Sequence, residues 1–513
     1  MTQTLIGLDY EGVPAVKITK GSIDPAEEPD DNVGSFLYNS KWTKDYKIAG
    51  IDLMPQVGAA TFTPSGSGLS NYTKYTEPVG SFNINRQNSY FRNSYFPNLA
   101  YDLPLCEVKT KRISNGRFFG SVITEVLTGY DRRAGNWRTP AREWFGWGTG
   151  MTVYYNAGSG YLGTGTVVTN DFVWPSGQLN EPFYNNIVVW NLPGDSTAIL
   201  DGTPPPPVGG ATVIQLDSAG MRVAKPGFNL NSISRPTQLA FDTANHPTKI
   251  IGAADIYCPP GASSYDIGVT IPPNAVADVH FYQGSTIYYP MEPVGFEVKY
   301  GAEYWFSGST IQFNNPYTAC RARFIIYAVS TQGTTSGDND VIRQFTSGGE
   351  NVVQILRPGA GANPTFADIV VDSRWPCIQI LKEGYISVGT GILTHTVNFD
   401  GAGCFPMVKY MTVHGGGSGS GGPEYFVPSW SSRVRAPFLN LCGVYKVGWS
   451  GGQGGDSTYC TLTNSQATFY TFRGQPIRRY YDDFEDYNNN VVSYDYDPSP
   501  IVGIRYYILG IPA

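Results

Sequence analysis

The chain reads Val16-Lys17-Ile18-Thr19-Lys20-Gly21 near its beginning and, after a polar stretch, Phe36-Leu37-Tyr38-Asn39-Ser40. The same pattern, an apolar run ending in a basic residue and glycine and then a second apolar run ending in Asn or Asp before Ser or Thr, occurs twice more. We call this pattern the repeated phrase. Its other copies are Val223-Ala224-Lys225-Pro226-Gly227 with Leu239-Ala240-Phe241-Asp242-Thr243, and Ile355-Leu356-Arg357-Pro358-Gly359 with Ile369-Val370-Val371-Asp372-Ser373.

Each half of the repeated phrase has the form of a short buried strand closed by turn-forming residues. A pattern that recurs along a chain predicts an array of similar modules. We therefore expect three related β-modules. Arrays of this kind more often present surfaces and span distances than enclose a single catalytic cleft.

The composition predicts an all-β protein with very little helix. Of the 513 residues, 14% are aromatic and only 15% are charged, and the chain contains 60 Gly and 35 Tyr. Strands favour Tyr, Thr, Val and Phe, and the many short apolar runs between Gly and Pro residues are typical of β-sandwiches or barrels. We expect tandem sandwich-like modules with loop insertions.

Two polar stretches predict the domain boundaries. Pro204-Pro205-Pro206-Pro207 favours an extended spacer, and the run 330–340 is polar and lacks apolar periodicity. Copies two and three of the repeated phrase begin shortly after these stretches. We therefore predict domains at 1–203, 211–335 and 345–513.

Several classes of function are disfavoured. The net charge of −7 argues against a sequence-independent nucleic-acid binder, which needs a basic face. No run reaches the roughly 20 apolar residues that cross a bilayer, and residues 1–9 lack the basic and apolar regions of a signal peptide. The seven cysteines have no CxxC spacing, so we interpret most of them as small buried residues in a reducing compartment.

The phrases "VKITKG…FLYNS" and "MRVAKPG…LAFDT", together with the closing "IRYYILGIPA", resemble recurrent phrases in structural proteins of tailed-phage virions. Those phrases occur near the tail tip or in tail fibres. The resemblance implies a β-rich virion component that is assembled in the host cytoplasm without a signal peptide.

Three motifs that could carry chemistry have simpler interpretations. Gly448-Trp449-Ser450-Gly451-Gly452 matches G-x-S-x-G, but the glycine-rich stretch after it cannot begin the helix that a nucleophile elbow needs. The four histidines are isolated and lack zinc spacing; His395, in an alternating run, is interpreted as a strand histidine. The acidic residues in 482–486 and 495–497 could serve a glycosidase or bind Ca²⁺. The favoured interpretation is a solvated loop. The acidic residues in 338–340 are a similar candidate for binding calcium. We expect no catalytic residue, cofactor or metal.

One segment departs from the sparing use of charge. Residues 131–147 contain four arginines and three tryptophans. Arg stacked on Trp forms rigid amphipathic surfaces typical of interface hot spots and can also hold sugars or phosphates; core packing of the tryptophans is the alternative. Tyr-rich stretches offer similar recognition chemistry. The candidate contact residues for a partner protein or receptor are Arg132, Arg133, Trp137, Arg138, Arg142, Trp144, Trp147, Tyr480 and Tyr481.

Together these observations predict a non-enzymatic structural protein of a phage virion, at the distal tail as a fibre, tip or baseplate component. It would dock to other tail proteins and contribute to attachment to a host glycan or protein. Because exposed strand edges and the apolar strand Ile504–Ile511 need cover, we expect a homo-oligomer, with a trimer favoured. A capsid decoration or head-fibre protein and, less favoured, a polysaccharide depolymerase are the alternatives.

Overall fold

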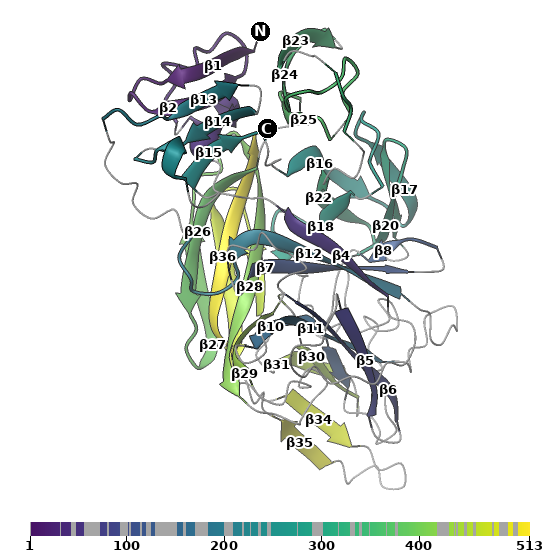
Figure 1. The fold of residues 1–513 in the computed structure, drawn as a ribbon. Helices are drawn as coiled ribbons and strands as arrows, with labels where there is room; N and C mark the ends of the chain where they lie inside the picture. Colours follow the sequence, from purple (N-terminus) through teal and green to yellow (C-terminus); the bar gives the residue numbers. More distant parts are fainter. Residues whose placement is uncertain are drawn as a thin grey trace.

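The regular secondary structure of the computed structural model consists almost entirely of strands, most of them paired antiparallel (Figure 1). This confirms the all-β prediction. Helical structure in the described part is limited to the 3-10 turns η1 (Val33–Ser35), η2 (Ser40–Trp42) and η5 (Leu230–Ser232). The structure describes residues 2–30, 32–42, 48–55, 72–79, 82–92, 101, 104–112, 115–119, 125–128, 151–156, 161–169, 183–199, 209–217, 220–225, 227–233, 238–243, 248–273, 275–289, 301–315, 318–328, 334–337, 341–347, 349–365, 367–374, 378–417, 430–435, 437, 440–445, 449–454, 458–474, 477–481, 491–495 and 501–512.

Each copy of the repeated phrase forms the second and third strands of a three-stranded antiparallel sheet, which we call a cap sheet. The glycine that closes the first half of the phrase has a positive φ in all three copies, at Gly21, Gly227 and Gly359, a conformation that glycine adopts without steric cost. The three cap sheets are β1 (Gln3–Leu8), β2 (Pro14–Thr19) and β3 (Phe36–Asn39); β13 (Ile214–Asp217), β14 (Gly220–Ala224) and β15 (Leu239–Asp242); and β23 (Ile342–Ser347), β24 (Glu350–Leu356) and β25 (Ile369–Asp372).

The cap sheets agree in register down to single residues. Ile18 pairs with Tyr38, Val223 with Phe241 and Ile355 with Val371, and in each sheet the register shifts one residue further along the middle strand. The hydroxyl that ends the phrase accepts a hydrogen bond from the middle strand in every copy. These bonds run from the backbone N of Val16 to Ser40, of Met221 to Thr243 and of Val353 to Ser373, at 2.9, 3.0 and 3.0 Å.

The three cap sheets share one hydrophobic core at one end of the molecule (Figure 1). Equivalent positions from each sheet contribute to it, so the copies pack against one another instead of forming separate cores. Equivalent residues of the three repeats thus meet in one shared core, the relation that approximate threefold symmetry produces. The cluster contains Val16, Ile18, Tyr38, Met221, Val223, Ala240, Phe241, Val353, Ile355, Val370 and Val371.

Each cap sheet is followed by a second three-stranded unit, the inner sheet, with the same strand order and the same bulge in its first strand. We call β1–β12, β13–β22 and β23–β36 the first, second and third repeats. The inner sheets are β4 (Ile48–Pro55), β12 (Phe183–Pro193) and β7 (Pro104–Arg112); β16 (Lys249–Cys258), β22 (Cys320–Ala328) and β18 (Val276–Tyr282); and β26 (Gln379–Ser387), β36 (Ile501–Pro512) and β28 (Cys404–Gly417), each written in spatial order.

The middle strands of the inner sheets have two apolar faces because alternate side chains point to opposite sides of a sheet. One face joins a central core that includes Trp190, Tyr327 and Leu509, at equivalent positions of the three repeats. The other face, in the second and third repeats, packs on an outer sheet to make a sandwich. The outer strands are β17 (Gly261–Asp266), β21 (Thr310–Asn315) and β20 (Glu303–Ser307) in the second repeat, and β27 (Gly391–Asn398), β33 (Gln466–Arg473) and β32 (Thr458–Leu462) in the third.

Sheets run from one repeat into the next. The outer strands of the second repeat continue through β8 (Phe118–Phe119) into the inner sheet of the first, and β19 (Ile287–Tyr289) of the second joins the outer strands of the third. The inner sheet of the third continues through β29 (Trp430–Arg435) into four strands of the first. Those four are β10 (Met151–Asn156), β11 (Tyr161–Thr169), β6 (Phe82–Arg92) and β5 (Tyr72–Val79).

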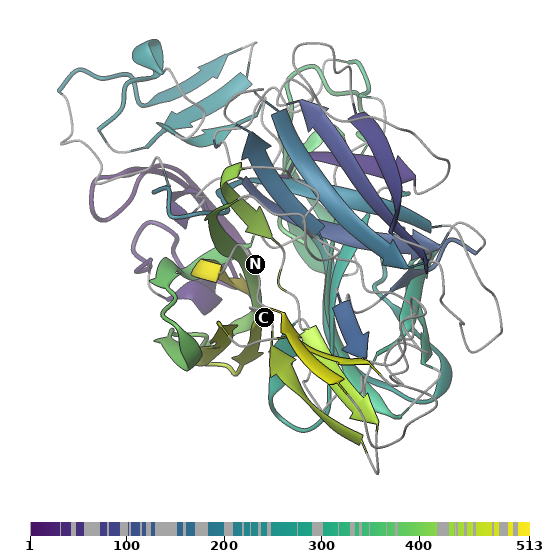
Figure 2. The same cartoon turned by 90° about the horizontal axis from the view of Figure 1, so that it is seen from below.

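The segments 1–203, 211–335 and 345–513 therefore contribute strands to common sheets. Their boundaries as independent domains stay a prediction. The apolar strand at the C-terminus, β36, is the middle strand of its sheet and is hydrogen-bonded on both sides by β26 and β28. Its own chain thus covers it. Both ends of the chain lie toward the end that carries the cap sheets (Figure 1), and Figure 2 views the molecule from the opposite end. Among the described residues, none of the helical segments has the length and hydrophobicity to cross a bilayer.

Candidate functional site

The insertions of the first and third repeats gather at the end of the molecule opposite the cap sheets (Figure 1). We call this the insertion end. Two pairings join the insertions of the two repeats: β10 pairs with β29, and β9 (Glu125–Thr128) pairs in parallel with β30 (Asn440–Tyr445). The remaining strands here are β31 (Trp449–Gly454), β34 (Ile477–Tyr481) and β35 (Val491–Asp495).

The predicted Arg/Trp contact residues lie outside the described residues, but the strands on both sides of them do not. β9 ends at Thr128 and β10 begins at Met151, so the segment that carries Arg132, Trp137 and Trp144 leaves and re-enters the fold at the insertion end. Tyr480 and Tyr481 lie on β34, paired with Val492 and Val491 of β35. β34 in turn lies beside β9 and β30. The fold thus brings the supporting strands of both predicted contact sets to one end.

The predicted chemical motifs do not form a catalytic group in the described part. Ser450 lies within β31, paired with Val444 in a β-hairpin, so it does not occupy the strand-to-helix turn of a nucleophile elbow. His395 lies within β27, opposite Phe469, as expected for a strand histidine. The acidic residues 482–486, 496–497 and 338–340 lie outside the described residues.

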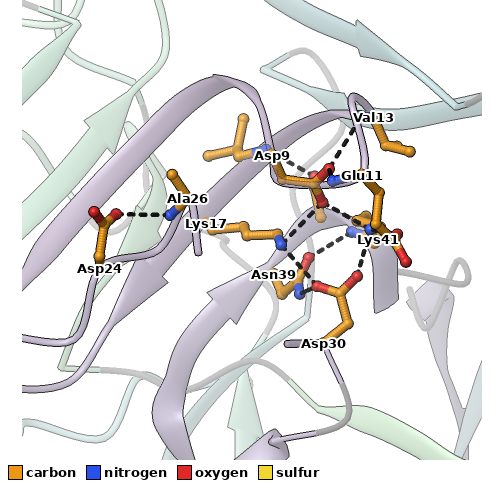
Figure 3. A network of polar contacts seen from close by, with 11 residues as sticks. Asp9, Glu11, Val13, Lys17, Asp24, Ala26, Asp30, Asn39 and Lys41 are labelled. Carbon is orange, nitrogen blue, oxygen red and sulfur yellow. Dashed lines mark hydrogen bonds and ion pairs between the residues drawn. The ribbon is translucent and has the colours of Figure 1, made fainter. Parts of the chain in front are cut away.

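A cluster of charged side chains occupies the first cap sheet (Figure 3). Asp9, Glu11 and Asp30 approach one another closely enough to share a cation, but two lysines already lie between them. The Nζ atom of the fully buried Lys17 is 3.0 Å from Asp9 and 2.8 Å from Asp30, and that of Lys41 is 2.7 Å from Asp9 and 2.6 Å from Glu11. Burial alone would raise the pKa of Asp9, yet these lysines lower it to about 2. The ammonium groups fill the place of a metal ion, and the cluster ties this sheet together.

The most unusual site is a layer of buried charges between the three inner sheets. Glu107, Asp278 and Lys409 occupy the same register position in β7, β18 and β28, opposite Val188, Ile325 and Tyr507 of the middle strands. All three are almost fully buried. Equivalent positions of the three repeats therefore carry two carboxylates and one ammonium group, which form a single ion-paired group.

The charges of this layer balance, because two carboxylates pair with two ammonium groups. Lys409 forms ion pairs with Glu107 and with Asp278, and Lys109, two residues after Glu107 on β7, forms ion pairs with the same two carboxylates. Burial alone would raise the pKa of Asp278, but Lys109 and Lys409 hold it well below its ordinary value. Conversely, Asp278 and Glu107 outweigh the effect of burial and raise the pKa of Lys109. We call Glu107, Lys109, Asp278 and Lys409 the axial charge layer.

Aromatic residues of the central core complete the layer. The indole Nε1 of Trp190 donates to Glu107 at 3.0 Å, and the hydroxyl of Tyr327 donates to Asp278 at 3.3 Å. The ammonium group of Lys409 lies over both rings, 4.7 Å from the centroid of Trp190 and 5.3 Å from that of Tyr327. Such contacts supply the hydrogen bonds and cation–π attraction that buried charges need.

His280 lies next to the layer, on β18, and is neutral. Its ring is 2% exposed and stacks on Tyr289 with the centroids 4.8 Å apart. Its Nδ1 has no hydrogen-bond partner among the residues that the structure describes. Burial lowers the pKa of His280 to about 3, so the ring stays uncharged at neutral pH.

Sequence reasoning missed the axial charge layer, although a signal for it exists. In the second and third repeats a charged residue interrupts an apolar strand, as in Val276-Ala277-Asp278-Val279 and Met407-Val408-Lys409-Tyr410. A charge in such a place needs a buried partner. The partners of Asp278 and Lys409 were not recognisable because they lie in other repeats.

Comparison with known proteins does not identify the chain. No family model, no curated protein and no solved structure matches it. Its function must therefore be argued from its own geometry.

Proposed function

We propose that the protein is a non-enzymatic structural component of a phage virion, located at the distal tail as a fibre, tip or baseplate component. It docks to other tail proteins and contributes to attachment to the host surface. The observation that carries the proposal is the two-ended arrangement of the chain: three equivalent cap sheets form one end, and the insertions form the other.

The cap end is suited to docking because it repeats the same structure three times around a common core. Such a surface matches the threefold or sixfold symmetry of a tubular assembly. The insertion end is suited to contact with the host because it holds the two strands that flank the Arg/Trp segment and the strand that carries Tyr480 and Tyr481. The first and third repeats both contribute to the insertion end.

The charges in the described part support a structural role over catalysis. The clustered carboxylates of Asp9 and Asp30, and those of Glu107 and Asp278, are all paired with lysines. A depolymerase would need free carboxyl groups on the two sides of a sugar. Release of oligosaccharide from host polysaccharide incubated with the purified chain would contradict the non-enzymatic proposal.

Immunogold labelling of the virus that encodes this chain tests the location. Antibodies against the purified protein should label the tail tip. Labelling of the capsid would instead support the decoration or head-fibre alternative.

Binding of the labelled chain to host cells tests the proposed contact surface. Trp144→Ala, in the segment between β9 and β10, and Tyr481→Ala, on β34, should each weaken binding by at least about 10-fold if these residues are hot spots. Tyr257→Ala is the matched control, since Tyr257 is 64% exposed on the second repeat and should bind as the unaltered chain does. Equal binding by all three variants would refute the assignment of the contact surface.

A homotrimer remains a prediction, but its original reason has changed. β36 is covered within the chain, and the three repeats already form a threefold arrangement. The mass of the purified protein in solution, measured by light scattering, decides between one chain and three.

A further inference from the structure

Two cysteines of the second repeat lie directly opposite each other on neighbouring strands. Cys258 ends β16 and Cys320 begins β22, and the two are register partners in the antiparallel pair. Their thiols are hydrogen-bonded to each other, and neither cysteine forms a disulfide. Opposed residues in antiparallel strands have Cα atoms about 4.5–5.5 Å apart, within the range that a disulfide spans.

We propose that Cys258 and Cys320 form an oxidation site that closes into a cross-strand disulfide when the protein leaves a reducing environment. The site joins the first strand of the inner sheet to its middle strand. It lies far from the insertion end, and it does not depend on the proposed virion function.

The surroundings favour Cys258 as the thiol that reacts first. Its sulfur accepts hydrogen bonds from Cys320 and from the hydroxyl of Ser263, which lies 3.9 Å away. These donors outweigh burial and lower the pKa of Cys258, whereas its neighbour raises that of Cys320. The thiolate is the reactive form of cysteine, so one member of the pair is prepared as a nucleophile and the other as the resolving thiol.

The third repeat indicates that packing does not require cysteine at these positions. When the two inner sheets are aligned on their bulges, the equivalents of Cys258 and Cys320 are Val388 and Val502. Val388 donates its backbone N–H to the carbonyl of Val502 at 3.0 Å. Cys258 and Cys320 share one core, whereas Val388 packs beneath the outer sheet of its repeat and Val502 packs against the central core. Valine thus occurs at both positions of the third repeat, and the cysteine pair adds the capacity to form a bond.

The oxidant must be small because Cys258 is fully buried and Cys320 is only 3% exposed. We assign this role to a peroxide. The thiolate of Cys258 attacks one peroxide oxygen, the O–O bond breaks, and the departing hydroxide takes up a proton to form water, leaving a sulfenic acid. The sulfur of Cys320 then attacks that sulfur, its proton combines with the displaced hydroxide, and a second water is released. Two thiols and one peroxide become one disulfide and two waters.

The test uses the full chain, purified in reductant, freed of it, and treated with a small excess of hydrogen peroxide. Mapping of alkylated peptides should recover Cys258 linked to Cys320, in a protein about 2 Da lighter. The unfolding temperature should rise by about 5 °C or more, and dithiothreitol should reverse both changes. Recovery of both cysteines as free thiols, or of either one linked to another cysteine, would overturn the proposal.

Variants separate the cross-link from other effects of oxidation. The double variant Cys258→Val/Cys320→Val should fold as the reduced protein does, because the third repeat carries valines there, and peroxide should leave its unfolding temperature unchanged. Cys460→Ala is the matched control: Cys460 is equally buried, but its register partners on the neighbouring strands are Tyr289 and Phe469 instead of a cysteine. It should keep the cross-link and the temperature rise. A peroxide-induced rise of the same size in the double variant would contradict the assignment.

Discussion

Removal of one cation from the axial charge layer should destabilise the whole molecule. In Lys409→Met the methionine keeps most of the aliphatic length of the side chain, but of the two ammonium groups that pair with Glu107 and Asp278 only that of Lys109 is left. The side chains of Lys409, Glu107 and Asp278 are 5%, 9% and 8% exposed, so water cannot replace the lost ammonium group. Breaking a buried ion pair from one side costs about 3–5 kcal/mol, a large part of a typical folding free energy of about 5–15 kcal/mol.

The loss should depend on pH in a defined direction. In the unaltered chain the pKa of Asp278 is depressed by Lys109 and Lys409, so this contribution to stability is present above its unfolded pKa of about 3.9 and is lost as the pH falls below it. In the variant a carboxyl of the layer has a higher pKa and takes up a proton more readily. The difference in stability between the two proteins should therefore be smaller at pH 5 than at pH 7.

Urea unfolding followed by circular dichroism at both pH values measures this difference. Lys382→Met is the matched control because Lys382 is exposed on β26, and its effect should stay within about 0.5 kcal/mol. A cost below about 1 kcal/mol for Lys409→Met, or the same cost at pH 5 and pH 7, would refute the reasoning.

Three further predictions, with five substitutions in all, test other parts of the structure. Ser40→Ala, Thr243→Val and Ser373→Ala each leave one buried backbone N–H unpaired, so each should lower the free energy of unfolding by a similar ~1–3 kcal/mol in urea titrations; a cost confined to one of them would contradict the equivalence of the cap sheets. His280→Met should flatten the pH dependence of stability, because the depressed pKa of His280, about 3, makes the unaltered chain lose about 2 kcal/mol between pH 7 and pH 5 as the unfolded state takes up the proton; an equal loss in the variant would refute this. Asp368→Ala removes the fully buried acceptor that holds residues 334–337, so limited proteolysis should cut there faster than in the unaltered chain, and unchanged cleavage would argue against this role.

The sequence predicted the parts of the fold that depend on local pattern. The repeated phrase led to strands because Val16–Thr19 and its counterparts combine β-formers with a turn glycine, and all three copies form the same sheet with the same bulge. Its spacing could not show that the copies pack against one another. That contact joins residues such as Ile18, Val223 and Ile355, which are far apart in the chain.

The same limit explains the candidate sites. The contact residues of 131–147 stood out by composition, which is a local signal. The axial charge layer depends on Glu107, Asp278 and Lys409, which belong to three different repeats. The sequence around each of them therefore does not show the charged residues of the other repeats that it meets in the fold. The pairing becomes visible only when the three inner sheets are placed around one axis. The prediction that the C-terminal strand is exposed was wrong for the same reason. The strands that cover it, β26 and β28, begin more than 80 residues earlier in the chain.

A charge exchange between repeats tests most directly whether the three repeats of one chain meet around a common axis. Lys409→Asp and Asp278→Lys should each destabilise the protein by at least about 3 kcal/mol, because each leaves three like charges in the layer. The double variant restores two acids and two bases, so urea unfolding should recover most of the loss, with a coupling of at least about 3 kcal/mol. Single effects that add to within about 0.5 kcal/mol would mean that residues 278 and 409 do not share a layer, and would contradict the threefold arrangement.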